Sequence, residues 1–251
     1  MLLLKKRYVK GLKKSLYILK LMTVFFSVFN VCYAQQSGNV QYKIFPTGGT
    51  FENLDKVKSS SLSGYFKGID DAIKSLIAEL NFSDNKAYYN LLPSMNIEDR
   101  INKAARSFAG NGEYFYTKTG EYIHKKSLLG EEFCVKHRSD NDWKLTSESK
   151  IISNYICYKA TRIRTNNVKG ILKKYEVVAW YCPKIPVNFG PIGYGNLPGL
   201  ILELQEPTKT YCAFKINLES KKIEIKKINC APISEEEFEM RYKKVLDDHY
   251  K

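Results

Sequence analysis

The chain has 251 residues and a formal net charge of +14, with 40 Lys and Arg side chains against 26 Asp and Glu. Seven of the basic residues and none of the acidic ones fall in the first 34 residues, so 33 basic and 26 acidic side chains remain beyond them, a net charge of +7. Those charges alternate in sign and form no basic stripe, which argues against a nucleic-acid-binding function.

The first 34 residues have the pattern of a secretory signal peptide. A basic leader precedes an apolar run from Leu21 to Phe29, and cleavage is expected after Ala34. The run is shorter than the roughly 20 apolar residues of a membrane-spanning helix. We therefore expect a soluble mature chain without a transmembrane segment, located in the periplasm, at the outer membrane or outside the cell. Residues 35–251 are long enough for one domain.

The first half of the mature chain predicts a strand, two helices and a hairpin. The alternation of VQYKIF favours a strand over Val40–Phe45. Helical spacing of Ile69, Ile73, Leu76, Ile77 and Leu80 indicates a helix, and ELNFSDNKAYYNLL predicts a hairpin about Asp84 and Asn85. A second helix is expected with Asn96 as its cap, Glu98 and Asp99 in its first turn, and Gly110 after its end.

Beyond Gly112 the pattern changes to a period of two. Short strands are predicted at EYFYTK, EYIHKK, EEFCVKH, SNYICYKATRIR, KKYEVVAWYC, GLILELQ, KTYCAFKINL and KKIEIKKIN. A polar loop with Asn166, Asn167 and Gly170 is expected between the fourth and fifth. Short connections favour antiparallel pairing.

The chain is expected to end in a helix beginning near Ser234. Ser234 and Glu237 form a capping box, and an apolar face predicts packing on the sheet. The fold class is therefore mainly β: a long twisted antiparallel sheet or an open barrel, covered by helices that include the C-terminal one.

The sequence contains no recognised catalytic or metal-binding motif. His124, His137 and His249 are the only histidines, and a closed metal site needs three or four convergent ligands. We expect no metal and no cofactor. The alternative is a hydrolase in which Glu203 and Glu176 act as an acid–base couple, and the test is whether these groups converge.

The cysteines of the mature chain allow two readings. Hairpin register brings Cys212 near Cys230 and Cys157 near Cys182, so these four are candidate disulfide partners. Buried free thiols are the other reading.

The segment WYCPKIPVNFGPIGYGNLPGLILEL concentrates four prolines between two strands. Pro198 and Gly199 suit the centre of a type II turn. The segment is read either as a structural corner or as a binding loop, with Trp180, Tyr181, Phe189 and Tyr194 as the candidate binding residues.

This segment, together with DWKLTSESKIISNYICYKAT upstream, resembles the GLPGLI family of secreted bacterial proteins. The resemblance covers about Trp143 to Leu204, and Asn196 stands where the family motif has Gly; Asn also tolerates positive φ. The structural motif positions are Gly190, Pro191, Leu197, Pro198, Gly199, Leu200 and Ile201.

The resemblance implies an envelope location and an association with outer-membrane TonB-dependent receptors, but no activity. The expected function is a non-catalytic module that binds a partner, such as that receptor, or a small apolar ligand. A hydrolase with an unrecognised site and an accessory subunit of an outer-membrane uptake system are the alternatives.

Overall fold

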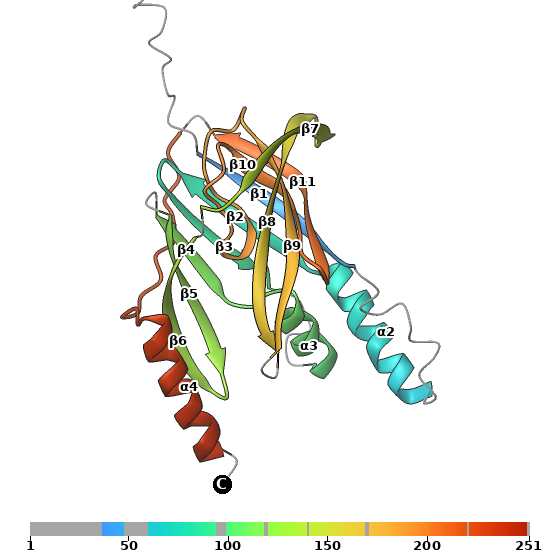
Figure 1. The fold of residues 1–251 in the computed structure, drawn as a ribbon, viewed down its shortest axis with the longest axis vertical. Helices are drawn as coiled ribbons and strands as arrows, with labels where there is room; N and C mark the ends of the chain where they lie inside the picture. The colour runs from blue at the N-terminus through green and yellow to red at the C-terminus, as the bar shows by residue number, and fades with distance from the viewer. Residues whose placement is uncertain are drawn as a thin grey trace, which may run out of the picture. The chain divides into compact units, whose positions relative to one another are not determined.

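An antiparallel sheet of eleven strands organises the part of the chain that the computed structural model describes, residues 37–47, 60–93, 99–117, 120–139, 141–168, 171–219 and 221–249 (Figure 1). The predicted signal peptide lies outside these residues. The elements in chain order are β1 (Ser37–Pro46), α2 (Ser60–Ser75), β2 (Ile77–Ser83), β3 (Lys86–Leu91), α3 (Arg100–Phe108), β4 (Glu113–Thr117), β5 (Glu121–Leu128), β6 (Glu131–Arg138), β7 (Lys144–Ile152), β8 (Tyr155–Val168), β9 (Ile171–Cys182), η2 (Pro191–Gly193), β10 (Leu200–Gln205), β11 (Lys209–Glu219) and α4 (Glu235–His249).

The sheet consists of two meanders joined in the middle. The strand order is β6-β5-β4-β3-β2-β1-β11-β10-β9-β8-β7. The central ladder pairs β1 with β11, from Ser37 opposite Glu219 to Pro46 opposite Lys209. The first and last strands of the sequence therefore lie side by side at the middle of the sheet, while β6 and β7, consecutive in the chain, form its two edges.

The short connection between β6 and β7 requires the sheet to curl. Only residues 139–143 join Arg138 to Lys144, a path that spans at most about 21 Å. Eleven strands spaced about 4.8 Å apart would separate the edges of a flat sheet by about 48 Å. The two edges must therefore bend toward each other, although no strand pairing joins them, so the sheet remains open.

The concave face of the sheet carries the core. Along β1, Val40, Tyr42 and Ile44 are fully buried while Lys43 is exposed, as the alternation of a half-buried strand requires. Ile69 and Ile73 bury one face of α2, which packs against β1 and α3. The predicted helix is shorter than expected, because Ile77 and Leu80 belong to β2.

The C-terminal segment covers one edge of the sheet. Ile233 adds a single parallel bridge to β6, with backbone hydrogen bonds of 2.8 Å to Cys134 and to Lys136. The predicted capping bond of α4 is present, since the Glu237 N–H donates to Ser234 Oγ over 3.1 Å. Phe238 packs edge-on against Phe133 of β6, so α4 lies along this strand (Figure 1).

Some local predictions are confirmed and others are wrong. The hairpin at Asp84 forms as expected, with Ser83 opposite Lys86. Asn166 and Asn167 belong to β8, because its ladder with β9 continues to Val168 opposite Ile171. The segment 221–229 is no strand, since β10 and β1 already occupy both edges of β11.

The start of α3 also differs from the prediction. The N-cap position is Asp99, whose side chain makes no capping bond, and the helix begins at Arg100. Asn96 and Glu98 lie outside the described residues. Gly110 follows the helix at φ 78°, a conformation that favours glycine and ends the helix as predicted.

Candidate functional site

Residues 183–199 connect β9 and β10, and we call this connection the motif loop. Its apolar side chains point into the core, and Ile185, Phe189 and Leu197 are at most 2% exposed. The N–H groups of Leu200 and Ile201 donate to the carbonyls of Ile185 and Phe189, each over 3.0 Å. The loop therefore folds back along β10 and fills the interior of the curled sheet.

The Pro198–Gly199 turn is tighter than the predicted type II turn. Gly199 N–H bonds the carbonyl of Leu197 over 2.8 Å, a three-residue turn about Pro198, and Gly199 has φ 157°. A Cβ at Gly199 would lie 2.3 Å from the carbonyl oxygen of Cys182, so a side chain does not fit. Asn196 adopts φ 61°, the positive value expected of an Asn at this position.

Tyr116 of β4 bonds two backbone groups in the middle of the motif loop. Its buried hydroxyl donates to the Gly190 carbonyl and accepts from the Gly193 N–H, both over 2.7 Å. Between them, Ile192 is held at φ 44° and ψ 46°, a left-handed conformation that a β-branched residue rarely adopts. The two bonds to Tyr116 stabilise this strained turn and connect the two meanders.

Three of the four candidate binding residues are buried. Tyr181, Phe189 and Tyr194 are 6%, 1% and 5% exposed, so a ligand cannot reach them without movement of the loop. Trp180 is half-buried and lies 4.4 Å from the Lys150 ammonium, which covers its ring. In this structure the aromatic side chains of the motif loop, Phe189 and Tyr194, are packed in the interior.

Tyr194 anchors the motif loop in a polar cluster. Its hydroxyl accepts from Arg164 Nη1 over 2.9 Å and donates to Glu206 Oε1 over 2.7 Å. Burial raises the pKa of Tyr194 well above its usual range. Trp143, which packs beside Tyr194, donates its indole N–H to the Gly195 carbonyl over 3.0 Å. The tryptophan of the upstream segment therefore supports the motif loop directly.

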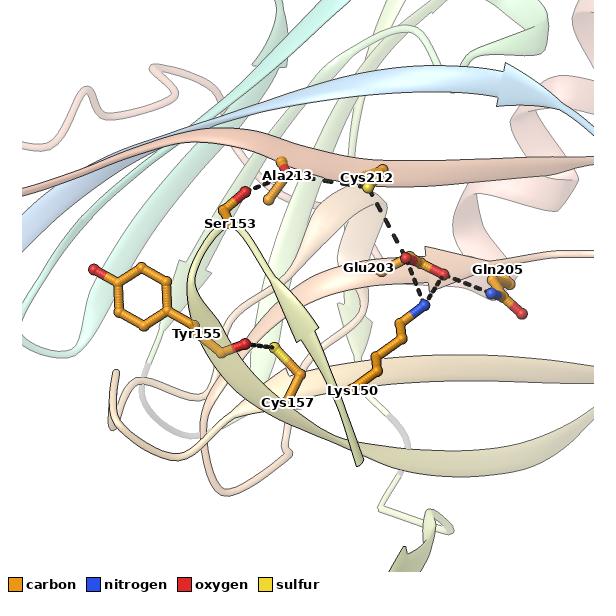
Figure 2. Close-up of polar contacts among 8 residues, drawn as sticks. All are labelled: Lys150, Ser153, Tyr155, Cys157, Glu203, Gln205, Cys212 and Ala213. Atoms are coloured by element: carbon orange, nitrogen blue, oxygen red, sulfur yellow. Dashed lines mark hydrogen bonds and ion pairs between the residues drawn. The ribbon is translucent and has the colours of Figure 1, made fainter. Parts of the chain in front are cut away.

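A second polar cluster lies on the opposite face of the sheet, around Glu203 (Figure 2). This carboxylate is 8% exposed and receives the Lys150 ammonium at 2.8 Å from each oxygen. Gln205 also donates to it, and the Cys212 thiol lies 3.9 Å away. Lys150 comes from β7, which is separated from β10 by two strands, so the tip of the β7–β8 hairpin bends over the sheet to reach Glu203.

Local sequence patterns do not reveal this ion pair. Lys150 precedes Glu203 by 53 residues and lies in a strand of alternating polar residues, which resembles any solvated edge. The burial of Glu203 among Leu202 and Leu204 is the one signal, since a buried carboxylate requires a partner.

The proposed acid–base couple does not form. Glu203 lies opposite Trp180, whereas Glu176 is exposed four positions away along β9, a separation of about 13 Å. His124 and His137 lie on β5 and β6, in the other meander. In the residues that the structure describes, no three His, Cys, Asp or Glu side chains are placed to hold a metal ion.

The cysteines pair differently from the prediction. Cys230 forms a disulfide with Cys134, across a Cα–Cα distance of 6.3 Å, and not with Cys212. The prediction failed because it required 221–229 to be a strand beside β11. Cys157, Cys182 and Cys212 are free thiols, so the second candidate disulfide is also not formed.

The β7–β8 hairpin exposes an apolar strip. Ile151 and Ile156 face each other across the hairpin and are 73% and 59% exposed. Tyr158, two positions from Ile156 on the same face, continues this strip. We call Ile151, Ile156 and Tyr158 the hairpin strip. Isolated exposed apolar residues are ordinary, but a contiguous group is typical of a contact surface.

One comparison with known proteins matches part of this region and assigns no activity. A family model described as a protein of unknown function (Porph_ging) matches residues 164–203. The matched segment runs from Arg164, which bonds Tyr194, through the motif loop to Glu203. No curated protein matches the chain. None of the helices in the described ranges has the length and hydropathy needed to cross a membrane.

Proposed function

We propose that the chain is a non-catalytic partner-binding protein of the cell envelope and a GLPGLI family member, and that its partner docks on the hairpin strip. The observation that carries this proposal is the contrast between the buried aromatic residues of the motif loop and the exposed isoleucines of the hairpin. The loop fills the space in which an apolar ligand would bind, whereas Ile151 and Ile156 remain uncovered.

The hairpin is held in a defined position, as a contact surface requires. Lys150 anchors it to Glu203, and Ser153 Oγ at its turn donates to the Ala213 carbonyl of β11 over 3.0 Å. A preorganised surface loses less conformational entropy on binding than a free one. The motif loop positions the strands on which the hairpin is anchored.

The proposed location follows from the signal peptide, and the Cys134–Cys230 disulfide is consistent with an oxidising compartment. The family resemblance names a candidate partner, an outer-membrane TonB-dependent receptor. The chain would then act as an accessory subunit of an uptake system. In that role the basic excess of the mature chain favours a partner with an acidic rim.

The test is a crosslinked pull-down from envelopes of the source cells with variants that place a charge in the strip. Ile156→Asp should abolish recovery of the receptor, because a carboxylate in an apolar contact must be desolvated. Leu172→Asp is the matched control, since Leu172 is 69% exposed but lies on β9, outside the strip. Equal recovery with both variants, or no enrichment of a receptor with the unmodified chain, would refute the proposal.

A further inference from the structure

Two of the free thiols face each other across neighbouring strands. Tyr158 of β8 lies opposite Tyr181 of β9, so the next pair in this antiparallel register is Cys157 and Cys182. Directly opposed residues have Cα atoms about 4.5–5.5 Å apart, a separation that a disulfide can span. Both side chains are fully buried, and neither is bonded to another cysteine.

The surroundings of the pair favour a thiolate on one partner. The Cys157 thiol donates to the Tyr155 carbonyl over 3.6 Å, and the Cys157 sulfur, the N–H groups of Ile185 and Lys184 and the Lys184 charge lie near the Cys182 sulfur. These groups outweigh burial and lower the pKa of Cys182, while the nearness of Cys182 raises the pKa of Cys157. A lowered thiol pKa favours the thiolate, so Cys182 is the cysteine that we expect to react first.

The pair lies beneath the tip of the β7–β8 hairpin. The Cys157 sulfur is 3.6 Å from the carbonyl oxygen of Tyr155, the first residue of β8 (Figure 2). The turn between the strands consists of Ser153 and Asn154, both at positive φ. Lys150 and Ser153 hold the tip by polar contacts, and Ile152 between them packs in the core, so a small molecule reaches the thiols only when the tip opens.

We propose that Cys157 and Cys182 are a redox-active dithiol, which small organic disulfides oxidise to a second intramolecular disulfide. The Cys182 thiolate attacks one sulfur of the organic disulfide, forms a mixed disulfide and expels one thiolate. Cys157 then loses its proton and attacks the Cys182 sulfur, which expels the second thiolate. The two protein thiols are oxidised by two electrons, and the organic disulfide is reduced to two thiols.

The bond would join the base of the hairpin tip to the first residue before the motif loop. The disulfide would limit the opening of the hairpin tip, because β8 and β9 could no longer separate at Cys157 and Cys182. This inference goes beyond partner binding and does not depend on the hairpin strip being a contact surface.

The experiment treats the native full chain with bis(2-hydroxyethyl) disulfide and follows the thiols over time by alkylation after denaturation and peptide mapping. The expected result is a linked Cys157–Cys182 peptide, with Cys212 still alkylated and Cys134–Cys230 intact. Cys212→Ser should react like the unmodified chain. Cys157→Ser should stop at a mercaptoethanol adduct on Cys182.

Two outcomes would overturn the proposal. One is that Cys157 and Cys182 remain alkylatable in the unmodified chain while its circular dichroism shows that it is folded. The other is that Cys182 links to Cys212 as readily as to Cys157. Because Cys212→Ser removes no thiol of the pair, the first outcome can be read even if Cys157→Ser does not fold.

Discussion

The two edges of the sheet are finished in different ways. At the β6 edge, Ile233 adds a backbone bridge, Cys230 is bonded to Cys134, and α4 packs alongside. At the β7 edge, the described residues add no strand, and the hairpin is anchored by Lys150 and Ser153. The β6 edge is covered by a segment that a disulfide links to it, and we call it the closed edge. The β7 edge is held by polar contacts and carries the hairpin strip.

This difference bears on which edge would take part in the proposed contact. An open edge strand is a hazard for nonspecific pairing, and β7 limits that hazard with a register shift between Leu145 and Ser149. Glu148 in the shifted segment also pairs with Lys159 of β8. Strand addition is thus discouraged along β7, and recognition is expected through side chains of the hairpin strip.

The largest expected effect on stability comes from removal of the disulfide at the β6 edge. Cys134→Ser should lower the free energy of unfolding by about 2–5 kcal/mol, because the disulfide closes a long loop in the unfolded chain. Urea unfolding of the unmodified chain and the variant measures the loss. Cys212→Ser is the control, since this thiol is free. A loss no larger than that of the control would contradict a structural role for the disulfide.

Removal of the hairpin anchor should have an intermediate effect. Lys150→Met leaves the Glu203 carboxylate buried without its cation, and the expected cost is about 2 kcal/mol, below that of a fully buried pair because the Lys150 side chain is 34% exposed. Lys150→Met with Glu203→Gln should recover part of this loss, since the uncompensated charge is gone. Urea unfolding of the single and double variants measures both.

The matched control for the anchor is Glu148→Gln. It breaks an ion pair on the same strand, but the Glu148 side chain is 59% exposed, so the expected cost is about 0.5 kcal/mol or less. If this variant and Lys150→Met lose equal stability, the Glu203 pair does not anchor the hairpin.

Mild acid is expected to loosen the closed edge and to leave the hairpin edge unchanged. Burial lowers the pKa of His124 to about 4, while Lys126 and His137 nearby add to the shift. The neutral form is favoured in the folded state, so its stabilisation is complete above the unfolded pKa of about 6.5 and is lost as pH falls toward 4. His137 and its partner Glu235 face the same region.

Hydrogen exchange can locate this effect. The unfolding free energy should fall between pH 7 and pH 5. After correction for the intrinsic pH dependence of exchange, the N–H groups of Lys136 and Ile233 should exchange faster than those along β7 and β8. His124→Gln should reduce the pH dependence. Uniform loosening of both edges would show that His124 is not its source.

Local patterns predicted most of the elements. The alternation of VQYKIF, the turn at Asp84 and the Ser234 cap each depend on neighbours within a few residues, and each is confirmed; the second bond of the capping box is not formed, because the Glu237 carboxylate pairs with Arg241. Errors arose where two local patterns competed. Ile77 and Leu80 continue a helical spacing but belong to a strand, because β1 and β3 provide its pairing partners.

The site was less predictable than the elements. Gly199 and Asn196 could be assigned to special backbone positions from their residue types, and both adopt positive φ. The roles of Tyr116 and Lys150 had no local signal, because each acts on a segment more than 50 residues away. Whether the loop aromatics face solvent or the core also depended on how far the sheet curls.

The sequence by itself determined the strand-rich class, the rigid proline–glycine loop and the C-terminal helix, since periodicity, turn chemistry and capping are short-range properties. Only the tertiary structure decided that β1 pairs with β11, that Cys134 bonds Cys230 and that Lys150 reaches Glu203. These contacts join residues far apart in the chain. The segment 221–229 is excluded from the sheet because both edges of β11, beside which it would pair, are already occupied by β1 and β10. The same closure of edges leaves the β7–β8 hairpin as the exposed part of the sheet.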